Sequence, residues 1–162
     1  MRVLAFFLGL LLMVEQAAAL SCKRPNLASS FNRFAQSDDT YRLAVGGFAY
    51  KQKIPTYKGA KPRHVKAAFT GQFLGLNGLT EIRSVPITIA TTCVAHWCGG
   101  FPEEGGQNIV FLKQTSDGMT LERPACPNGA LTPYSKERLN LVQRCLRRGK
   151  CTKAEEQLFE FK

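Results

Sequence analysis

Between residues 25 and 37, apolar side chains recur at the spacing of a helix. Leu27, Phe31 and Phe34 form one stripe, and the positions between them are small or polar. This pattern predicts an amphipathic helix of about three turns, with its apolar stripe buried against a core.

The centre of the chain alternates apolar and polar residues and is rich in β-branched and aromatic side chains. We expect strands over Tyr41–Tyr50, His64–Leu74, Glu81–Val94, Asn108–Gln114 and Met119–Arg123. Gly46 and Gly47 indicate a bulge or a sharp bend in the first strand, and Pro86 indicates an edge or a bend in the third. Turns are predicted at Gly75–Gly78 and Thr115–Gly118.

Helical spacing returns near the C-terminus. Thr132 and Pro133 suit the N-cap and first position of a helix, and Gly149 suits its end. The buried face of this helix is expected to carry Leu139, Val142 and Leu146. Thr152–Glu155 has the capping-box pattern for a last short helix. Several strands with a helix near each end predict an α+β or mainly β fold, such as a small barrel.

The chain opens with a positive residue, an apolar run and a small-residue site. Arg2 precedes the unbroken run Val3–Val14, and Ala17–Ala19 follows it. This order is typical of a cleavable secretory signal, and the run is too short to span a bilayer. We therefore predict a signal peptide over residues 1–19 and a single domain over 20–162, without a transmembrane span in the mature chain.

Two cleavage points satisfy the small-residue rule. One follows Ala19, and the other follows Ser21, which would make Cys22 the first residue of the mature protein. A lipid-modified Cys22 is the less favoured alternative, because Glu15 and Gln16 separate it from the apolar run.

The composition is strongly basic, with 22 Lys and Arg against 12 Asp and Glu and a net charge of +10. A basic protein exported to the periplasm or the extracellular space is attracted to anionic surfaces. The expected partners are an anionic polysaccharide, a lipid surface or an acidic protein. Nucleic acid is not expected in that compartment.

Basic residues gather in two segments. Within Lys51–Lys66, which contains no acid, the candidate anion-binding residues are Lys51, Lys53, Lys58, Lys61, Arg63 and Lys66. A second cluster contains Arg144, Arg147, Arg148, Lys150 and Lys153. Either cluster can instead be a solvated surface that keeps an exported protein in solution, and cations near the end of a helix also complement its dipole.

All 6 cysteines lie after the predicted signal. In an oxidising compartment an even set in a small domain predicts three disulfides, although sequence alone does not choose the pairing. Because short loops close most easily, the favoured pairing is Cys93–Cys98, Cys145–Cys151 and Cys22–Cys126.

The segment Cys93–Cys98 also allows other chemistry. Its two thiols with His96 between them could hold copper or zinc, but His64 is the only other histidine, so a complete site needs a distant ligand. A redox-active bridge is a further alternative, without the Cys-x-x-Cys spacing of thioredoxin-like sites. We favour a structural bridge with Trp97 packed on it, and we expect no cofactor.

Motifs for catalysis are not recognisable in the sequence. It contains 2 histidines, no G-x-S-x-G nucleophile motif and no phosphate-binding loop. The acidic pairs Asp38–Asp39 and Glu103–Glu104 lie in turn-like sequence, where solvated carboxylates are usual. We therefore expect a protein that works by binding and not an enzyme.

The order of these features resembles a netrin-like module, the OB-type barrel also found in tissue inhibitors of metalloproteinases. The resemblance rests on a cysteine at the mature start, the helix at 25–37, the strands YRLAVGG and NIVFLKQ, Cys98-Gly99, the hairpin before Cys126, and a terminal helix closed by Cys145 and Cys151. It implies a small five-stranded barrel with an N-terminal helix and C-terminal helices. The chain also resembles exported proteins of Gram-negative bacteria that start L-S-C-x-R-P and contain C-x4-C-G-G, for which no activity is implied.

In the inhibitors, the amine and carbonyl of a first cysteine bind the zinc of the target protease. The resemblance implies this role for Cys22 only if cleavage follows Ser21. Cys22-Lys23-Arg24 departs from the Cys-x-Cys start of the inhibitors, so a metalloprotease inhibitor is the second hypothesis. The first is an exported binding module for an anionic envelope component or acidic protein, and the third is a metal or redox protein using Cys93, His96 and Cys98.

Overall fold

The computed structural model describes residue 22 and residues 25–51, 53–54 and 61–158. The predicted signal peptide and both cleavage points lie outside these residues, as does Lys58. The helices are α2 (Leu27–Ala35), α3 (Lys136–Arg148) and α4 (Lys153–Leu158). The strands are β1 (Tyr41–Ala49), β2 (Arg63–Gly75), β3 (Gly78–Leu79), β4 (Arg83–Thr91), β5 (Cys93–Val94), β6 (Trp97–Cys98), β7 (Asn108–Thr115), β8 (Gly118–Arg123) and β9 (Leu131–Pro133).

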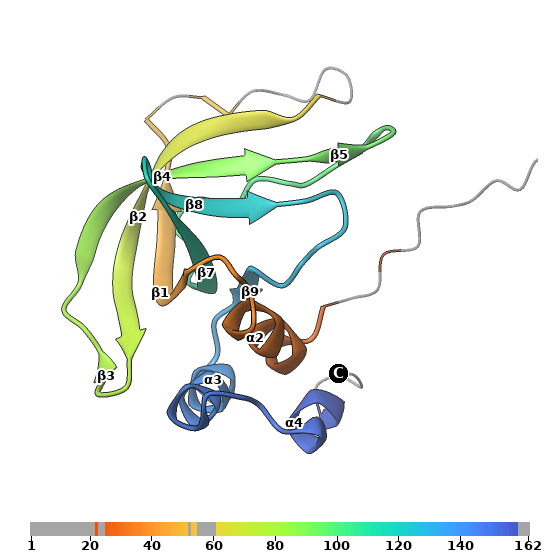
Figure 1. The fold of residues 1–162 in the computed structure, drawn as a ribbon. Helices are drawn as coiled ribbons and strands as arrows, with labels where there is room; N and C mark the ends of the chain where they lie inside the picture. The colour runs from red at the N-terminus through yellow and green to blue at the C-terminus, as the bar shows by residue number, and fades with distance from the viewer. Residues whose placement is uncertain (1–21, 23–24, 52, 55–60, 159–162) are drawn as a thin grey trace, which may run out of the picture.

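Five strands close into a mixed barrel (Figure 1). Antiparallel pairs join β1 to β2, β2 to β4, β8 to β7 and β7 back to β1, and the parallel pair β4–β8 completes the circuit. The fold is thus the small OB-like barrel with flanking helices that the sequence predicts. Among the described helices, none combines the length and the apolar composition that a membrane crossing requires.

The pair Gly46–Gly71 lets β1 and β2 cross closely above a buried aromatic ring. The β1–β2 register passes through this pair without an inserted residue, so the bulge considered at Gly46 and Gly47 is absent from it. A Cβ on either Gly46 or Gly71 would lie less than 3 Å from Cζ of Phe69, at 2.7 Å and 2.9 Å respectively. Glycine is therefore required here because the Phe69 ring, which is fully buried, occupies the space of a side chain.

We expect Gly71→Ala to lower the free energy of unfolding by about 2 kcal/mol, because the added methyl would lie 2.2 Å from the carbonyl oxygen of Val45. Urea denaturation followed by circular dichroism measures the change. Gly75→Ala is the matched control, since its Cβ would meet only Gly78 O, at 3.9 Å. A control that loses as much stability as Gly71→Ala would contradict the packing explanation.

The helices cover one end of the barrel, below the strands in Figure 1. In α2, the Phe34 ring stacks on Phe111 of β7 with centroids 4.7 Å apart, and Phe31 meets the same ring edge-on. Leu141 and Val142 of α3 are fully buried in the same core. The stripe predicted for α2 is thus buried. In α3 the predicted Leu139 and Val142 are buried and Leu146 is half-buried, while Leu141 was not predicted.

The start of α3 differs from the prediction. Thr132 and Pro133 belong to β9, where they pair with Ile109 and Asn108 of β7. The N-cap is instead Ser135, whose Oγ accepts a hydrogen bond from the backbone N–H of Arg138 at 3.2 Å. Strand pairing thus overrides the local helix-start pattern, whereas the predicted end of α3 at Gly149 is confirmed by its left-handed φ of 74°.

Candidate anion-binding surface

Three disulfides join Cys22 to Cys126, Cys93 to Cys98 and Cys145 to Cys151. This is the pairing that loop closure favours, and no described cysteine is free. The bridge at Cys22 leaves its sulfur no valence for a lipid. Because Lys23 and Arg24 lie outside the described residues, the inhibitor hypothesis stays a prediction.

The metal hypothesis at Cys93, His96 and Cys98 does not fit this structure. Both sulfurs are bonded to each other, so neither is available as a thiolate ligand. The same holds for the group Cys145, Cys151 and Glu155, whose ligand atoms lie within 4.8 Å of one another but whose sulfurs form a bridge.

The Cys93–Cys98 bridge closes a short hairpin whose tip is exposed. Val94 of β5 pairs with Trp97 of β6, and Ala95 between them has a left-handed φ of 49°. The prediction that Trp97 packs on the bridge is wrong, since 65% of this residue is exposed.

The basic residues of the first cluster lie on the two sides of the β1–β2 connection. Lys51 and Lys53 follow the end of β1, while Lys61 precedes Arg63, the first residue of β2. Lys51, Lys53 and Lys61 are exposed, and Arg63 is half-buried. These cations therefore lie at one end of the barrel.

Lys66 extends this basic end along the outer face of β2. Val65 and Phe69 point into the core, so Lys66 and Thr70 share the opposite face of the strand. The ammonium group of Lys66 donates a hydrogen bond to Oγ1 of Thr88 on β4 at 2.9 Å. Further along β2, the hydroxyl of Thr70 donates a hydrogen bond to Oγ of Ser84 at 3.1 Å. We name Lys51, Lys53, Lys61, Arg63 and Lys66 the basic surface.

An acidic residue, Glu104, borders the basic surface; it was expected only as a solvated carboxylate, and it is exposed but also holds a backbone contact. A hollow of about 430 Å³ is lined by Tyr50, Lys51, Lys53, Ile54 and Glu104. The Glu104 carboxylate accepts the backbone N–H of Tyr50 at 2.8 Å, and the Tyr50 hydroxyl donates to the carbonyl of Pro102 at 2.8 Å. Burial, followed by the Glu104 charge, raises the pKa of Tyr50 to about 12, so this phenol stays neutral. Glu104 thus anchors the chain that carries Lys51 and weakens anion binding inside the hollow itself.

Asp39 lies in an exposed loop, as expected, but it also forms an ion pair. Its carboxylate lies 2.6 Å from the ammonium group of Lys113, which also approaches Glu122 at 3.4 Å. Glu122 accepts the hydroxyl hydrogen of Tyr41 at 3.0 Å. The two carboxylates balance the positive charge of Lys113, so this lysine does not extend the basic surface.

Beyond Thr70, the outer face of β2 leads into a groove of about 510 Å³. Its lining includes Gly47, Gln72, Ile82 and Tyr134, with the connection at Gly105 on the far side. The sequence analysis did not identify this groove, although the glycines of β1 were the available signal. The side-chain amide nitrogen of Gln72 donates to the carbonyl of Thr80 at 2.8 Å, which holds this polar group in the lining of the groove.

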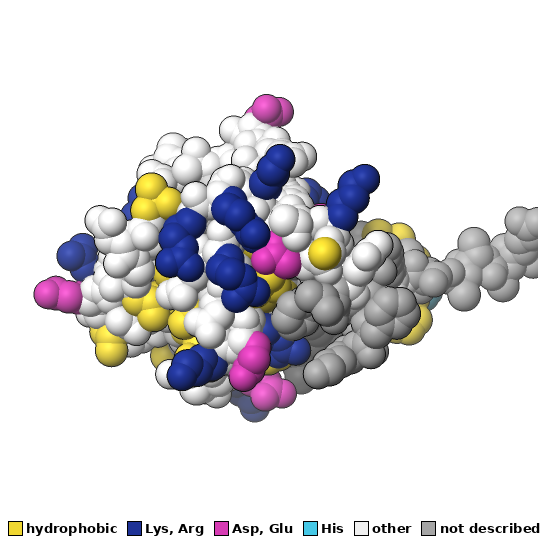
Figure 2. Space-filling model, turned by 90° about the horizontal axis from the view of Figure 1, so that it is seen from below, with side chains coloured by type: hydrophobic (Ala, Val, Ile, Leu, Met, Phe, Trp, Pro, Cys, Tyr) yellow, Lys and Arg dark blue, Asp and Glu magenta, His cyan; other side chains and the backbone are white. Residues whose placement is uncertain are grey.

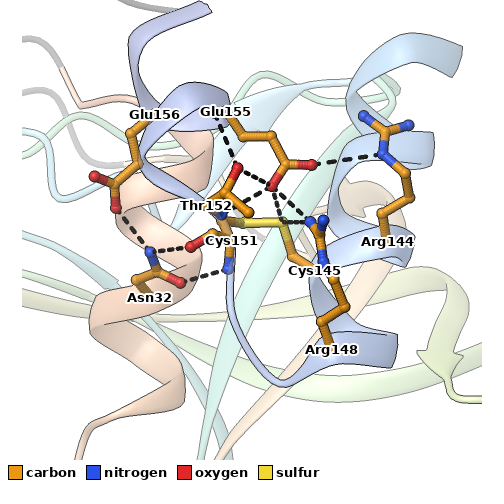
Figure 3. Close-up of polar contacts among 8 residues, drawn as sticks. All are labelled: Asn32, Arg144, Cys145, Arg148, Cys151, Thr152, Glu155 and Glu156. Carbon is orange, nitrogen blue, oxygen red and sulfur yellow. Dashed lines mark hydrogen bonds and ion pairs between the residues drawn. A yellow bond between two sulfur atoms is a disulfide. The ribbon is translucent and has the colours of Figure 1, made fainter.

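The second basic cluster lies on the face formed by the helices. Figure 2 looks at this underside and shows Lys and Arg side chains spread across it with acidic groups among them. Two of its members contact Glu155, with Arg148 Nη2 at 2.6 Å and Arg144 Nε at 3.5 Å from the carboxylate (Figure 3). Arg144 and Arg148 therefore stabilise the helical end, while Arg147 and Lys150 remain exposed.

The geometry suits an extended anionic ligand, with cations at one end of the barrel and hydrogen-bonding side chains along β2. OB-type barrels use the faces of the corresponding strands to bind oligosaccharides and oligonucleotides. Comparisons with protein-family models, with curated proteins and with solved structures found no match to this chain.

Proposed function

We propose that this protein is an exported, disulfide-stabilised binding module that contacts an anionic component of the cell envelope or an acidic protein. The observation that carries the proposal is the placement of the basic surface. Lys51 and Lys53 follow the end of β1, and Lys61, Arg63 and Lys66 lie around the start of β2, so the cations flank the β1–β2 connection. Three disulfides in so small a domain support an oxidising compartment.

The charge distribution favours the basic surface over the helical face as the binding site. On the helical face, the Glu155 carboxylate forms ion pairs with Arg144 and Arg148. On the basic surface, Lys66 instead donates to a neutral threonine, and Lys51, Lys53 and Lys61 are exposed. Among the described residues, these lysines form none of the ion pairs that hold Lys113, Arg144 and Arg148, so they retain their attraction for an anion.

Neutralising four exposed lysines together tests this proposal. The substituted residues are Lys51→Gln, Lys53→Gln, Lys61→Gln and Lys66→Gln. We expect at least about a tenfold loss of affinity at low salt for an acidic polysaccharide gel or for anionic phospholipid vesicles. Binding by the unaltered protein should itself weaken as NaCl is raised, because salt screens exposed charges.

The matched control removes the same charge from the helical face, at exposed positions. It carries Lys136→Gln, Arg147→Gln, Lys150→Gln and Lys153→Gln. This variant should bind nearly as well as the unaltered protein. Equal losses in the two variants would show that net charge alone governs binding, and binding insensitive to salt would contradict the proposal altogether.

A further inference from the structure

The β5–β6 hairpin presents two apolar side chains together at the surface. Val94 and Trp97 are opposite one another in the register, and 52% and 65% of these residues are exposed. Side chains of a directly opposed pair project on the same face of a hairpin. The Cys93–Cys98 disulfide closes the base of the hairpin, so it restricts the movement of the strands that carry Val94 and Trp97.

The hairpin that carries this apolar pair begins next to Arg63 of the basic surface. The hairpin begins just after Thr91, whose Oγ1 accepts the backbone N–H of Arg63 at 3.1 Å. On its other side, the backbone N–H of Thr92 donates to the carbonyl of Arg123 at 3.1 Å. Figure 1 shows the hairpin projecting beyond the barrel. The hairpin that carries Val94 and Trp97 is therefore joined to the barrel next to Arg63, the first residue of β2.

The interface of a lipid bilayer can bind both the apolar pair and the cations of the basic surface. Tryptophan favours the boundary between headgroups and acyl chains, where its ring is apolar and its N–H is hydrated. Cations beside it attract anionic headgroups. A sugar ring would use the indole face but would gain little from the exposed Val94, so the pair favours lipid over polysaccharide.

We propose that the protein attaches peripherally to an anionic lipid surface, with Trp97 and Val94 entering the interface and the basic surface contacting the headgroups. This inference rests on the proposed function and names the partner of the same surface. The net charge of +10 supplies the long-range attraction. The two apolar side chains supply a contact that salt does not screen.

The sequence contains 1 Trp, so its fluorescence reports on this hairpin alone. With vesicles of phosphatidylglycerol and phosphatidylcholine we expect a blue shift of the emission and quenching by brominated acyl chains. With pure phosphatidylcholine we expect neither. Trp97→Ala, followed by vesicle sedimentation, should weaken binding about tenfold, and Val94→Asp should reduce the blue shift.

Leu76→Ser is the matched control, because Leu76 is 70% exposed but follows Gly75 at the opposite end of β2. It should leave both binding and fluorescence unchanged. Circular dichroism checks that each variant is folded. A loss confined to the hairpin variants supports the inference.

Two results would overturn the inference and leave the proposed function standing. One is salt-sensitive binding to anionic vesicles without a change in Trp emission and without an effect of Trp97→Ala. The other is a Trp shift with a soluble acidic polysaccharide but none with vesicles. Failure to bind either the vesicles or the polysaccharide would overturn the lipid inference and would remove the anionic-envelope partner from the proposed function as well.

Discussion

Replacing Cys22 and Cys126 together with serine is expected to lower the free energy of unfolding by about 4 to 5 kcal/mol. This bridge joins residues 104 apart in the sequence, so it restricts the unfolded chain more than the other two. It also ties the segment before α2 to the connection between β8 and β9. Guanidinium denaturation followed by circular dichroism, with and without the substitutions, measures the loss.

The pair Cys93→Ser and Cys98→Ser provides the comparison. Its sequence separation is only 5, so the same chain-entropy argument gives a loss of about 2 kcal/mol. The hairpin that it closes carries exposed residues at its tip and contributes little to the core. Equal losses of unfolding free energy for the two double variants would contradict the loop-length explanation. They would indicate that local packing determines how much each disulfide stabilises the protein.

Local patterns predicted most individual elements of the barrel. Alternation identified the long strands because their inward positions, such as Phe69 and Ile89, are fully buried, whereas the neighbouring positions are exposed or half-buried and carry small or polar side chains. Pro86 was expected at an edge or a bend; it pairs with Ala68 of β2 and lies one residue before the β4–β8 ladder, which begins at Ile87. The parallel pairing of β4 with β8 could not be predicted from alternation, because it depends on strand order, and it was available only through resemblance to a known fold.

The candidate site was predictable in composition but not in shape. Its lysines are visible as a run without acids, yet the position of Glu104 beside Tyr50 results from a contact between residues 54 apart. Trp97 was expected to pack on the Cys93–Cys98 bridge, yet 65% of this residue is exposed. Exposure depends on the length of the hairpin and on what surrounds it, which a local pattern does not encode.

Glu155 is the most strongly held carboxylate of the helical end. Only 11% of its side chain is exposed, and it accepts hydrogen bonds from the backbone N–H of Thr152 at 2.9 Å and from its hydroxyl at 3.1 Å. The backbone N–H of Glu155 donates in return to Thr152 Oγ1 at 3.3 Å, which confirms the predicted capping box. The guanidinium of Arg148 completes the set (Figure 3).

Glu155→Ala should lower the free energy of unfolding by about 3 kcal/mol at neutral pH, because it leaves the Thr152 donors and Arg148 without their shared acceptor. Alanine is a good helix former, so propensity does not explain such a loss. Glu156→Gln is the matched control. Its carboxylate accepts only the Asn32 amide among the contacts drawn in Figure 3, and glutamine retains an acceptor. We expect this control to lose less than about 1 kcal/mol.

The Glu155 carboxylate should also make the stability of the protein depend on pH in the acid range. The hydrogen bond from Arg148, followed by those from Thr152, lowers the pKa of Glu155 from 4.5 to about 2. Because the folded-state pKa lies below the unfolded value, the stabilisation is present above pH 4.5 and is lost as the pH falls towards about 2. Urea denaturation across this range should therefore show the stabilities of the unaltered protein and Glu155→Ala converging as the pH is lowered. A difference that stays constant from pH 7 to pH 2 would show that Glu155 acts through packing and not through its charge.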